Sequence, residues 1–132
     1  MNKQRVLLAD DSKFLRAAHE LFLRKDGFSV ITAGDGEEAL RLARSEHPDV
    51  VVLDLLMPKL GGVEVLNALK QDPTTAQIPV VVLSGLSQNN ELKLTGAGAA
   101  LYVEKGKFGP ELLPEFVHAA LGDKASSQPQ AV

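Results

Sequence analysis

The chain has 132 residues, of which 45% are hydrophobic and 23% are charged. This length suits one domain, and the composition is that of a globular protein rather than a disordered one. The net charge of −3 argues against direct nucleic-acid binding, and the absence of cysteine excludes disulfides and thiolate metal sites. The apolar stretch near the N-terminus is too short for a signal peptide or a membrane span, so we expect a cytoplasmic protein without membrane contact.

The first half of the chain alternates between short apolar runs, typical of buried strands, and segments with helical spacing. Asp35 stands three residues before Glu38, a capping box that predicts a helix start, and His47-Pro48 stops that helix. In chain order the predicted elements are a strand at Val6–Ala9, a helix at Ser12–Lys25 with Leu15, Ala18, Leu21 and Phe22 at helical spacing and Gly27 at its end, a strand at Phe28–Ala33 and a helix from Asp35.

Three further strand–helix units are predicted in the second half. The helix around Asn89–Thr95 is expected to be short, because Gly96 and Gly98 follow and each glycine costs roughly 1 kcal/mol in a helix interior. Pro114 leaves two alternatives for the last helix, a start near Leu113 or a start at Pro110 with a kink. The other predicted elements are strands at Val50–Leu53, Val80–Leu83 and Ala100–Val103, a helix after Gly61-Gly62 with Val63, Leu66 and Leu69 on one face, and a last helix that carries Leu113, Phe116, Val117, Ala120 and Leu121.

The uninterrupted valine and leucine runs predict strands that are buried on both faces, as in a parallel sheet between two helical layers. Right-handed crossovers then give an α/β fold with a doubly wound, five-stranded parallel sheet. We expect one domain over residues 1–121. Residues 122–132 have no apolar period and are expected to form a disordered tail or a linker.

Polar residues stand where the predicted strands end. Asp10-Asp11, Asp54 and Ser84 follow the first, third and fourth strands, and Lys105 comes shortly after the fifth. The carboxyl ends of parallel strands share one edge, so these side chains should converge. At about 4 Å and an effective dielectric near 20, two carboxylates repel by about 4 kcal/mol, so either a carboxyl pKa rises or a cation neutralises the cluster. Carboxylate oxygens are hard ligands that suit Mg²⁺. A phosphoryl-transfer site results, in which Asp54 is the acceptor and Lys105 and Ser84 contact phosphoryl oxygens.

With these motifs the chain resembles response-regulator receiver domains, the phosphoacceptor modules of two-component signalling. The resemblance covers roughly residues 4–121 and implies a flavodoxin-like (CheY-like) fold with strand order 2-1-3-4-5. The residues that carry it are Asp10-Asp11, Asp54 with Met57-Pro58 and Gly62 after it, Ser84-Gly85, and Tyr102 three positions before Lys105.

The resemblance implies a phosphorelay role in which Asp54 receives a phosphoryl group from a sensor histidine kinase or a histidine phosphotransfer protein. Mg²⁺ would be bound by Asp11, Asp54 and the backbone carbonyl of Leu56, with Asp10 acting largely through water. Ser84 and Tyr102 would move on phosphorylation, and the face of the fourth helix, fifth strand and fifth helix would dock a downstream protein or the chain's own output domain. Such a domain is a regulator, a monomer or weak dimer that assists only its own phosphorylation and dephosphorylation, and not an enzyme.

The sequence departs from the family pattern after Lys105, where Gly106 stands in place of the usual proline with its cis peptide bond. A cis bond before a non-proline residue costs about 3–4 kcal/mol, so we predict a trans Lys105–Gly106 bond and a rearranged loop. His19, His47 and His118 show no metal spacing and are expected at the surface or at helix ends.

Two alternatives to the phosphoacceptor switch remain. The first is a pseudo-receiver, an interaction module that uses the fold without being phosphorylated, which Gly106 and the weak fourth helix favour. The second is a phosphatase or hydrolase with an aspartyl intermediate. Such enzymes commonly need a second acid two residues after the nucleophile, and Leu56 occupies that position here.

Overall fold

The computed structural model describes residues 3–55, 57, 60–85 and 98–122. Five parallel strands form one sheet in the order β2-β1-β3-β4-β5, which confirms the predicted topology. The predicted helix at Asn89–Thr95 and the tail at 123–132 lie outside the described residues. The strands are β1 (Arg5–Ala9), β2 (Ser29–Ala33), β3 (Val50–Asp54), β4 (Val80–Ser84) and β5 (Leu101–Glu104), and the helices are α1 (Lys13–Lys25), α2 (Gly36–Glu46), α3 (Gly62–Gln71), the 3-10 helix η1 (Pro110–Leu112) and α5 (Leu113–Leu121).

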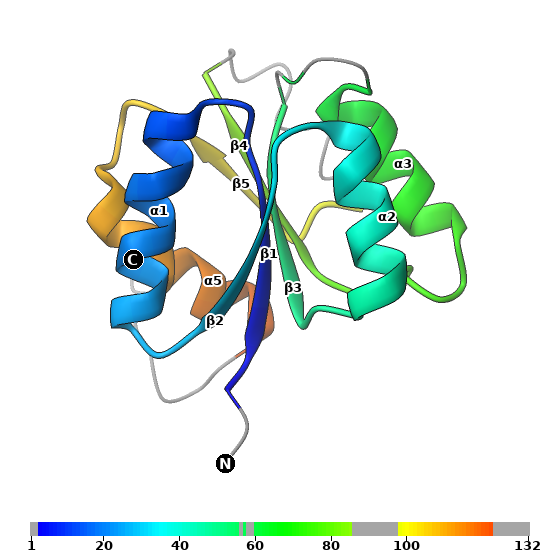
Figure 1. Cartoon of the computed structure of the whole chain (residues 1–132), viewed down its shortest axis with the longest axis horizontal. Coiled ribbons are helices and arrows are strands. Elements are labelled where there is room, and N and C mark those ends of the chain that lie inside the picture. The colour runs from blue at the N-terminus through cyan, green and yellow to red at the C-terminus, as the bar shows by residue number, and fades with distance from the viewer. Residues whose placement is uncertain (1–2, 56, 58–59, 86–97, 123–132) are drawn as a thin grey trace.

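The sheet is a central layer with helices on both sides. α1 and α5 cover one face, and α2 and α3 cover the other (Figure 1). Successive strand side chains point to opposite faces, so each central strand contributes to two cores. In β3, Val51 and Leu53 pack on the α2–α3 side, while Val50 and Val52 pack on the α1–α5 side. This double burial is the reason why β3 and β4 lack the alternation of polar and apolar residues.

Side-chain caps begin the first two helices. Ser12 Oγ accepts the backbone N–H of Leu15 at 3.2 Å, and Asp35 Oδ1 accepts that of Glu38 at 2.9 Å. Glu38 Oε1 in turn accepts the backbone N–H of Gly34 at 2.9 Å. In a usual capping box this acceptor bonds the N–H of the N-cap residue, here Asp35, so the bond in this protein forms one residue earlier. These bonds supply partners for amide groups that have none within a helix.

The last helix combines the two alternatives that the sequence left open. η1 begins at Pro110, and regular α-helix begins at Leu113. Pro114 thereby lies in the first turn of α5, where its missing N–H breaks no helical hydrogen bond.

Three assignments of helical faces were wrong. Leu21 on α1 and Val63 on α3 are 54% and 38% exposed, although apolar faces were predicted there. His19, expected at the surface or a helix end, is only 8% exposed. The buried side of α1 carries His19 and Leu23, which are four residues apart and therefore lie on one stripe. Leu21 lies midway between them in sequence, and the helical turn directs it away from the sheet.

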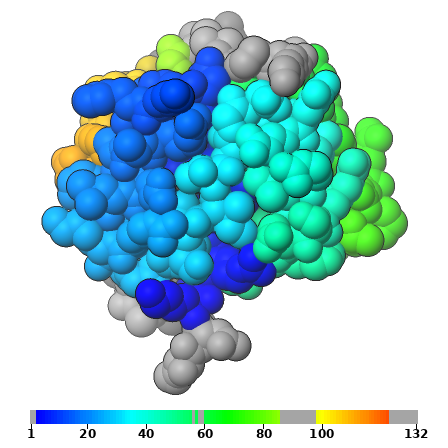
Figure 2. All heavy atoms as spheres, viewed as in Figure 1, coloured from blue at the N-terminus to red at the C-terminus, as the bar shows by residue number. Residues whose placement is uncertain are grey.

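On the side of the molecule that Figure 2 shows, the edge strand β2 lies between α1 and α2, which cover opposite faces of the sheet. Among the helices that the structure describes, none has the length and apolar content needed to cross a lipid bilayer.

Candidate phosphoacceptor site

The strand register brings the predicted site residues to one edge of the sheet. Ala9 pairs with Leu53 across β1 and β3, so the next residue of each strand places Asp10 beside Asp54. Asp54 pairs with Leu83 of β4, and Ser84 comes one step later. The sheet therefore assembles side chains that are up to 74 positions apart in the sequence.

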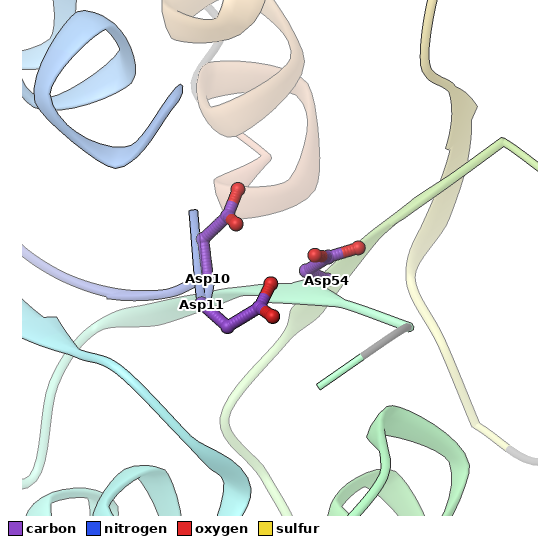
Figure 3. Close-up of side chains that lie close together, drawn as sticks. All are labelled: Asp10, Asp11 and Asp54. Atoms are coloured by element: carbon purple, nitrogen blue, oxygen red, sulfur yellow. The ribbon is translucent and has the colours of Figure 1, made fainter. Parts of the chain in front are cut away.

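Asp10, Asp11 and Asp54 form a carboxylate cluster. Each offers an oxygen that lies within 4.8 Å of those of the other two. Figure 3 shows Asp11 directed toward Asp54, with all three side chains at the ends of β1 and β3. Asp10 and Asp54 are 0% and 3% exposed, whereas Asp11 is exposed. Two acids are thus held in a low-dielectric setting, and the third faces the solvent from which a cation would enter.

The two oxygens of Asp10 differ in their surroundings. Oδ1 accepts the backbone N–H of Ser12 at 2.9 Å and so shapes the turn into α1. The guanidinium of Arg16 donates to the backbone carbonyl of Asp10 at 2.6 Å, which adds to this turn. Oδ2 is buried and has no hydrogen-bond partner among the described residues. A buried carboxylate oxygen is costly without a partner, so Oδ2 fits a hard cation or a water molecule bound to one.

Lys105 contacts Asp54 directly. Its Nζ lies 3.1 Å from Asp54 Oδ1, and the lysine side chain is 27% exposed while that of Asp54 is 4% exposed. One ammonium against three carboxylates leaves a formal excess of two negative charges at the site. The lysine therefore offsets part of the repulsion and leaves room for a divalent cation.

Ser84 is the buried last residue of β4, with 1% exposure. Its carbonyl oxygen accepts the backbone N–H of Lys105 at 2.6 Å, so β4 fixes the start of the loop that carries the lysine. The strand ends thus hold both residues that were predicted to contact phosphoryl oxygens.

The loop after Lys105 differs from the usual family arrangement as predicted. The Lys105–Gly106 peptide bond is trans, and Gly106 has φ of +89°. Positive φ is accessible to glycine without the steric cost that a Cβ brings. Glycine therefore lets the loop take this conformation with a trans peptide bond.

Two further predicted residues have different outcomes. Tyr102 on β5 is half-buried and packs against the core on the α2–α3 side, as expected for an aromatic residue near a sheet edge. Leu56, whose backbone carbonyl was predicted as a metal ligand, lies outside the described residues.

His19 is a neighbour of the site that sequence reasoning missed. Burial lowers the pKa of its imidazole, the charge of Lys105 lowers it further, and Asp54 acts in the opposite direction. Its Nδ1 has no hydrogen-bond partner among the described residues. The available signal was its spacing of four from both Leu15 and Leu23, which places it on the inner stripe of α1.

Comparison with known proteins agrees with this geometry. Residues 6–118 match the response regulator receiver domain. The chain is 40% identical over 131 residues to a probable transcriptional regulator, ycf27, of Porphyridium aerugineum, and the match covers 96% of this chain and 52% of that protein. It is 37% identical over 123 residues to the alkaline phosphatase synthesis transcriptional regulatory protein PhoP of Bacillus subtilis, with 92% and 49% covered. The chain thus spans about half the length of these relatives.

Solved structures share the fold. The chemotaxis response regulator CheY4 of Vibrio cholerae superposes with a TM-score of 0.83 at 29% identity, and the match covers 90% of this chain and 99% of that one. A putative response regulator from Chloroflexus aurantiacus gives 0.84 at 30% identity, with 92% and 99% covered. With its family match over most of its length, its strand order and its acidic strand ends, this chain belongs to the receiver domains of two-component response regulators.

Proposed function

We propose that this chain is a phosphorylation switch in which Asp54 accepts a phosphoryl group from a phosphohistidine of a sensor histidine kinase or a histidine phosphotransfer protein. The observation that carries the proposal is the ammonium of Lys105, 3.1 Å from Asp54 in a cluster of three carboxylates. An isolated acid would not need this lysine, whereas an acid that becomes an acyl phosphate needs a cation beside the new oxygens.

In the proposed transfer, a carboxylate oxygen of Asp54 attacks phosphorus and forms the P–O bond of an acyl phosphate. The P–N bond to the donor imidazole breaks, and the leaving imidazole takes a proton from solvent. Lys105 exchanges its contact with Asp54 for one with a phosphoryl oxygen, and the hydroxyl of Ser84 donates to another. The chain thereby assists its own phosphorylation and dephosphorylation and acts as a regulator rather than as an enzyme on separate substrates.

We infer that Mg²⁺ binds at Asp10, Asp11, Asp54 and the backbone carbonyl of Leu56. The described donors fit the ion, because they are hard carboxylate oxygens and because Oδ2 of Asp10 is buried without a partner among the described residues. When bound, the ion supplies charge neutralisation for the transferred group. Lys105 and Ser84 would contact the phosphoryl oxygens directly.

Phosphorylation is proposed to bias the face formed by the fourth helix, β5 and α5, through Ser84 and Tyr102. β5 connects the site to this face, because Tyr102 lies on this strand, three residues before Lys105. To shift the equilibrium between two conformations of this face from 1:99 to 99:1, about 5.5 kcal/mol of differential stabilisation is needed. A dianionic phosphoryl group bound to a metal, an ammonium and a hydroxyl can supply it.

The downstream partner is proposed to be a protein or an output domain of the same polypeptide. Relatives of about twice this length are named transcriptional regulators, so nucleic-acid contact is assigned to an output domain and not to this acidic domain. We further propose that the domain acts in the cytoplasm, away from the membrane, as a monomer or a weak dimer.

Incubation with acetyl phosphate and Mg²⁺, followed by intact mass measurement, tests the function. The wild type should gain one phosphoryl mass, and Asp54→Ala should gain none. Asp49→Ala is the matched control, because Asp49 precedes β3 at the opposite end, where it accepts the N–H of Arg5 at 2.7 Å. No gain by the wild type would instead support the pseudo-receiver, which Gly106 in place of the usual proline favours. Equal gain by Asp54→Ala would show that the phosphoryl group is on another residue and would overturn the proposal.

A further inference from the structure

A cavity of about 130 Å³ lies beside the acceptor site, between α1, the end of β5 and the start of α5. α1 and η1 lie side by side on this face of the sheet (Figure 1). The wall is mostly apolar and includes Leu15, Leu83 and Phe116. Engineered apolar cavities of about 150 Å³ bind benzene, so this space is close to the size of one aromatic ring.

His19 gives the cavity a neutral polar group. It is one of the lining residues, is 8% exposed, and carries a buried Nδ1 without a hydrogen-bond partner among the described residues. Burial and the nearby Lys105 lower its pKa, so the ring is uncharged at neutral pH and offers one donor and one acceptor nitrogen. A polar atom buried without a partner is destabilising, and a ligand that supplies the partner gains affinity from this.

The charged groups at the cavity disfavour an ionic ligand. Lys105 lines it, but its ammonium is already paired with Asp54 at 3.1 Å. Glu104 also lines it and would repel a carboxylate. Two aromatic rings line the cavity, those of Phe108 and Phe116, which meet edge-to-face with centroids 5.1 Å apart. Such rings pack favourably with a further aromatic ring, so they favour an aromatic ligand.

We propose that this cavity binds a small uncharged aromatic molecule that carries one hydroxyl group, that is, a ligand of the phenol class. The ring packs between Leu15 and the two phenylalanines, and the imidazole of His19 turns its buried Nδ1 toward the hydroxyl, which supplies the missing hydrogen-bond partner. None of the three clustered carboxylates lines the cavity, although Lys105 both lines it and contacts Asp54.

Titration of the folded chain with phenol, followed by amide chemical shifts, tests the proposal. We expect saturable binding with a Kd on the order of 1 mM, in keeping with the efficiency of small ligands, and shifts centred on the cavity. Benzoate should bind at least about tenfold more weakly, because it is charged and Glu104 repels it. His19→Leu should weaken phenol binding about three- to tenfold and leave benzene binding in place, because only the hydroxyl needs the imidazole.

Phe108→Ala and Phe14→Ala form a matched pair of surface changes that keep the core intact. Phe108 is 48% exposed and lines the cavity, whereas Phe14 is 81% exposed and is not among the lining residues. Phe108→Ala should weaken both phenol and benzene, and Phe14→Ala should weaken neither. Absence of saturable phenol binding to the wild type, or equal phenol affinity in folded His19→Leu, overturns the proposal. These measurements use neither acetyl phosphate nor Mg²⁺, so their outcome is independent of phosphorylation at Asp54.

Discussion

A Cβ atom on Gly62 would lie only 2.6 Å from the backbone carbonyl oxygen of Asp54. It would lie equally close to the Cα of Leu55, and real Cβ atoms do not approach backbone to that distance. The N–H of Gly62 donates to the carbonyl of Leu55 at 3.0 Å, so the first turn of α3 packs on the backbone that carries Asp54. The glycine allows this approach, and the approach in turn supports Asp54.

Gly62→Ala should therefore lower the free energy of unfolding by about 1–3 kcal/mol, because the added methyl group must displace backbone. It should also slow phosphorylation by acetyl phosphate, since Asp54 shifts with that backbone. Gly61→Ala is the control, because a Cβ there would meet mainly the far end of the Glu64 side chain, which can move aside. Urea denaturation and intact mass measure the two effects. Equal stability losses at the two glycines would contradict this account.

Gly106 should matter for the site as well as for stability. Its φ is +89°, and apart from the two chain neighbours no atom of the described residues lies within 4 Å of the position that a Cβ would take, so the cost of Gly106→Ala is the backbone strain alone, about 1 kcal/mol. Gly27 has φ of +98° and equally open surroundings at the end of α1, far along the chain from the site. Both alanine variants should lose similar stability in urea, but only Gly106→Ala should change the rate of phosphorylation, because its strain moves Lys105. Unchanged kinetics in Gly106→Ala would argue that the loop does not position the lysine.

Removal of the lysine charge should strengthen Mg²⁺ binding. The ammonium of Lys105 competes with the ion for Asp54 Oδ1, so Lys105→Gln should bind Mg²⁺ about tenfold more tightly. This factor corresponds to a binding free energy of about 1.4 kcal/mol, the size expected when a partly screened positive charge is removed. Lys107→Gln removes an equal charge from a lysine that pairs with Glu104 at 3.7 Å, and it should change the affinity little. Amide chemical shifts during a Mg²⁺ titration give both constants. Weaker binding in Lys105→Gln would show that the lysine helps to hold the ion.

His19 should give the domain a pH-dependent stability. Burial lowers its pKa from the ordinary value of 6.5, Lys105 lowers it further, and Asp54 partly offsets both. The unfolded chain therefore takes up a proton at a pH where the folded chain does not, so the free energy of unfolding falls as the pH drops below about 6.5. Glu104 also lines the cavity beside His19.

His19→Leu and His19→Gln should both lose this slope between about pH 7 and pH 5, even though their absolute stabilities differ through packing. Urea denaturation at several pH values measures the slope. A wild-type slope retained in both variants would assign the pH dependence to other groups.

The period of apolar residues was sufficient to predict the five strands, their parallel direction and the edge where the polar residues meet, whereas the strand order came from the family resemblance. The physical reason is that a strand buried on both faces requires an unbroken apolar run, as in β3 and β4, and few soluble arrangements other than a two-sided parallel sheet satisfy several such runs. Asp10, Asp54, Ser84 and Lys105 then had to share an edge, because each ends or directly follows a strand and these strands all run in the same direction. The trans peptide bond after Lys105 was also predictable, since glycine there removes the reason for a cis bond.

Tertiary structure alone decided which side of each helix turned inward and what each polar atom met there. α1 rotates so that His19 faces the sheet and Leu21 faces solvent, because helical rotation is set by the fit of the whole stripe against the strands and not by the hydrophobicity of one residue. Tertiary structure also decided the surroundings of the two carboxylate oxygens of Asp10. Oδ1 accepts the N–H of Ser12, and Oδ2 is buried without a hydrogen-bond partner among the described residues. Such partners come from segments distant in sequence, and local periodicity contains no information about them.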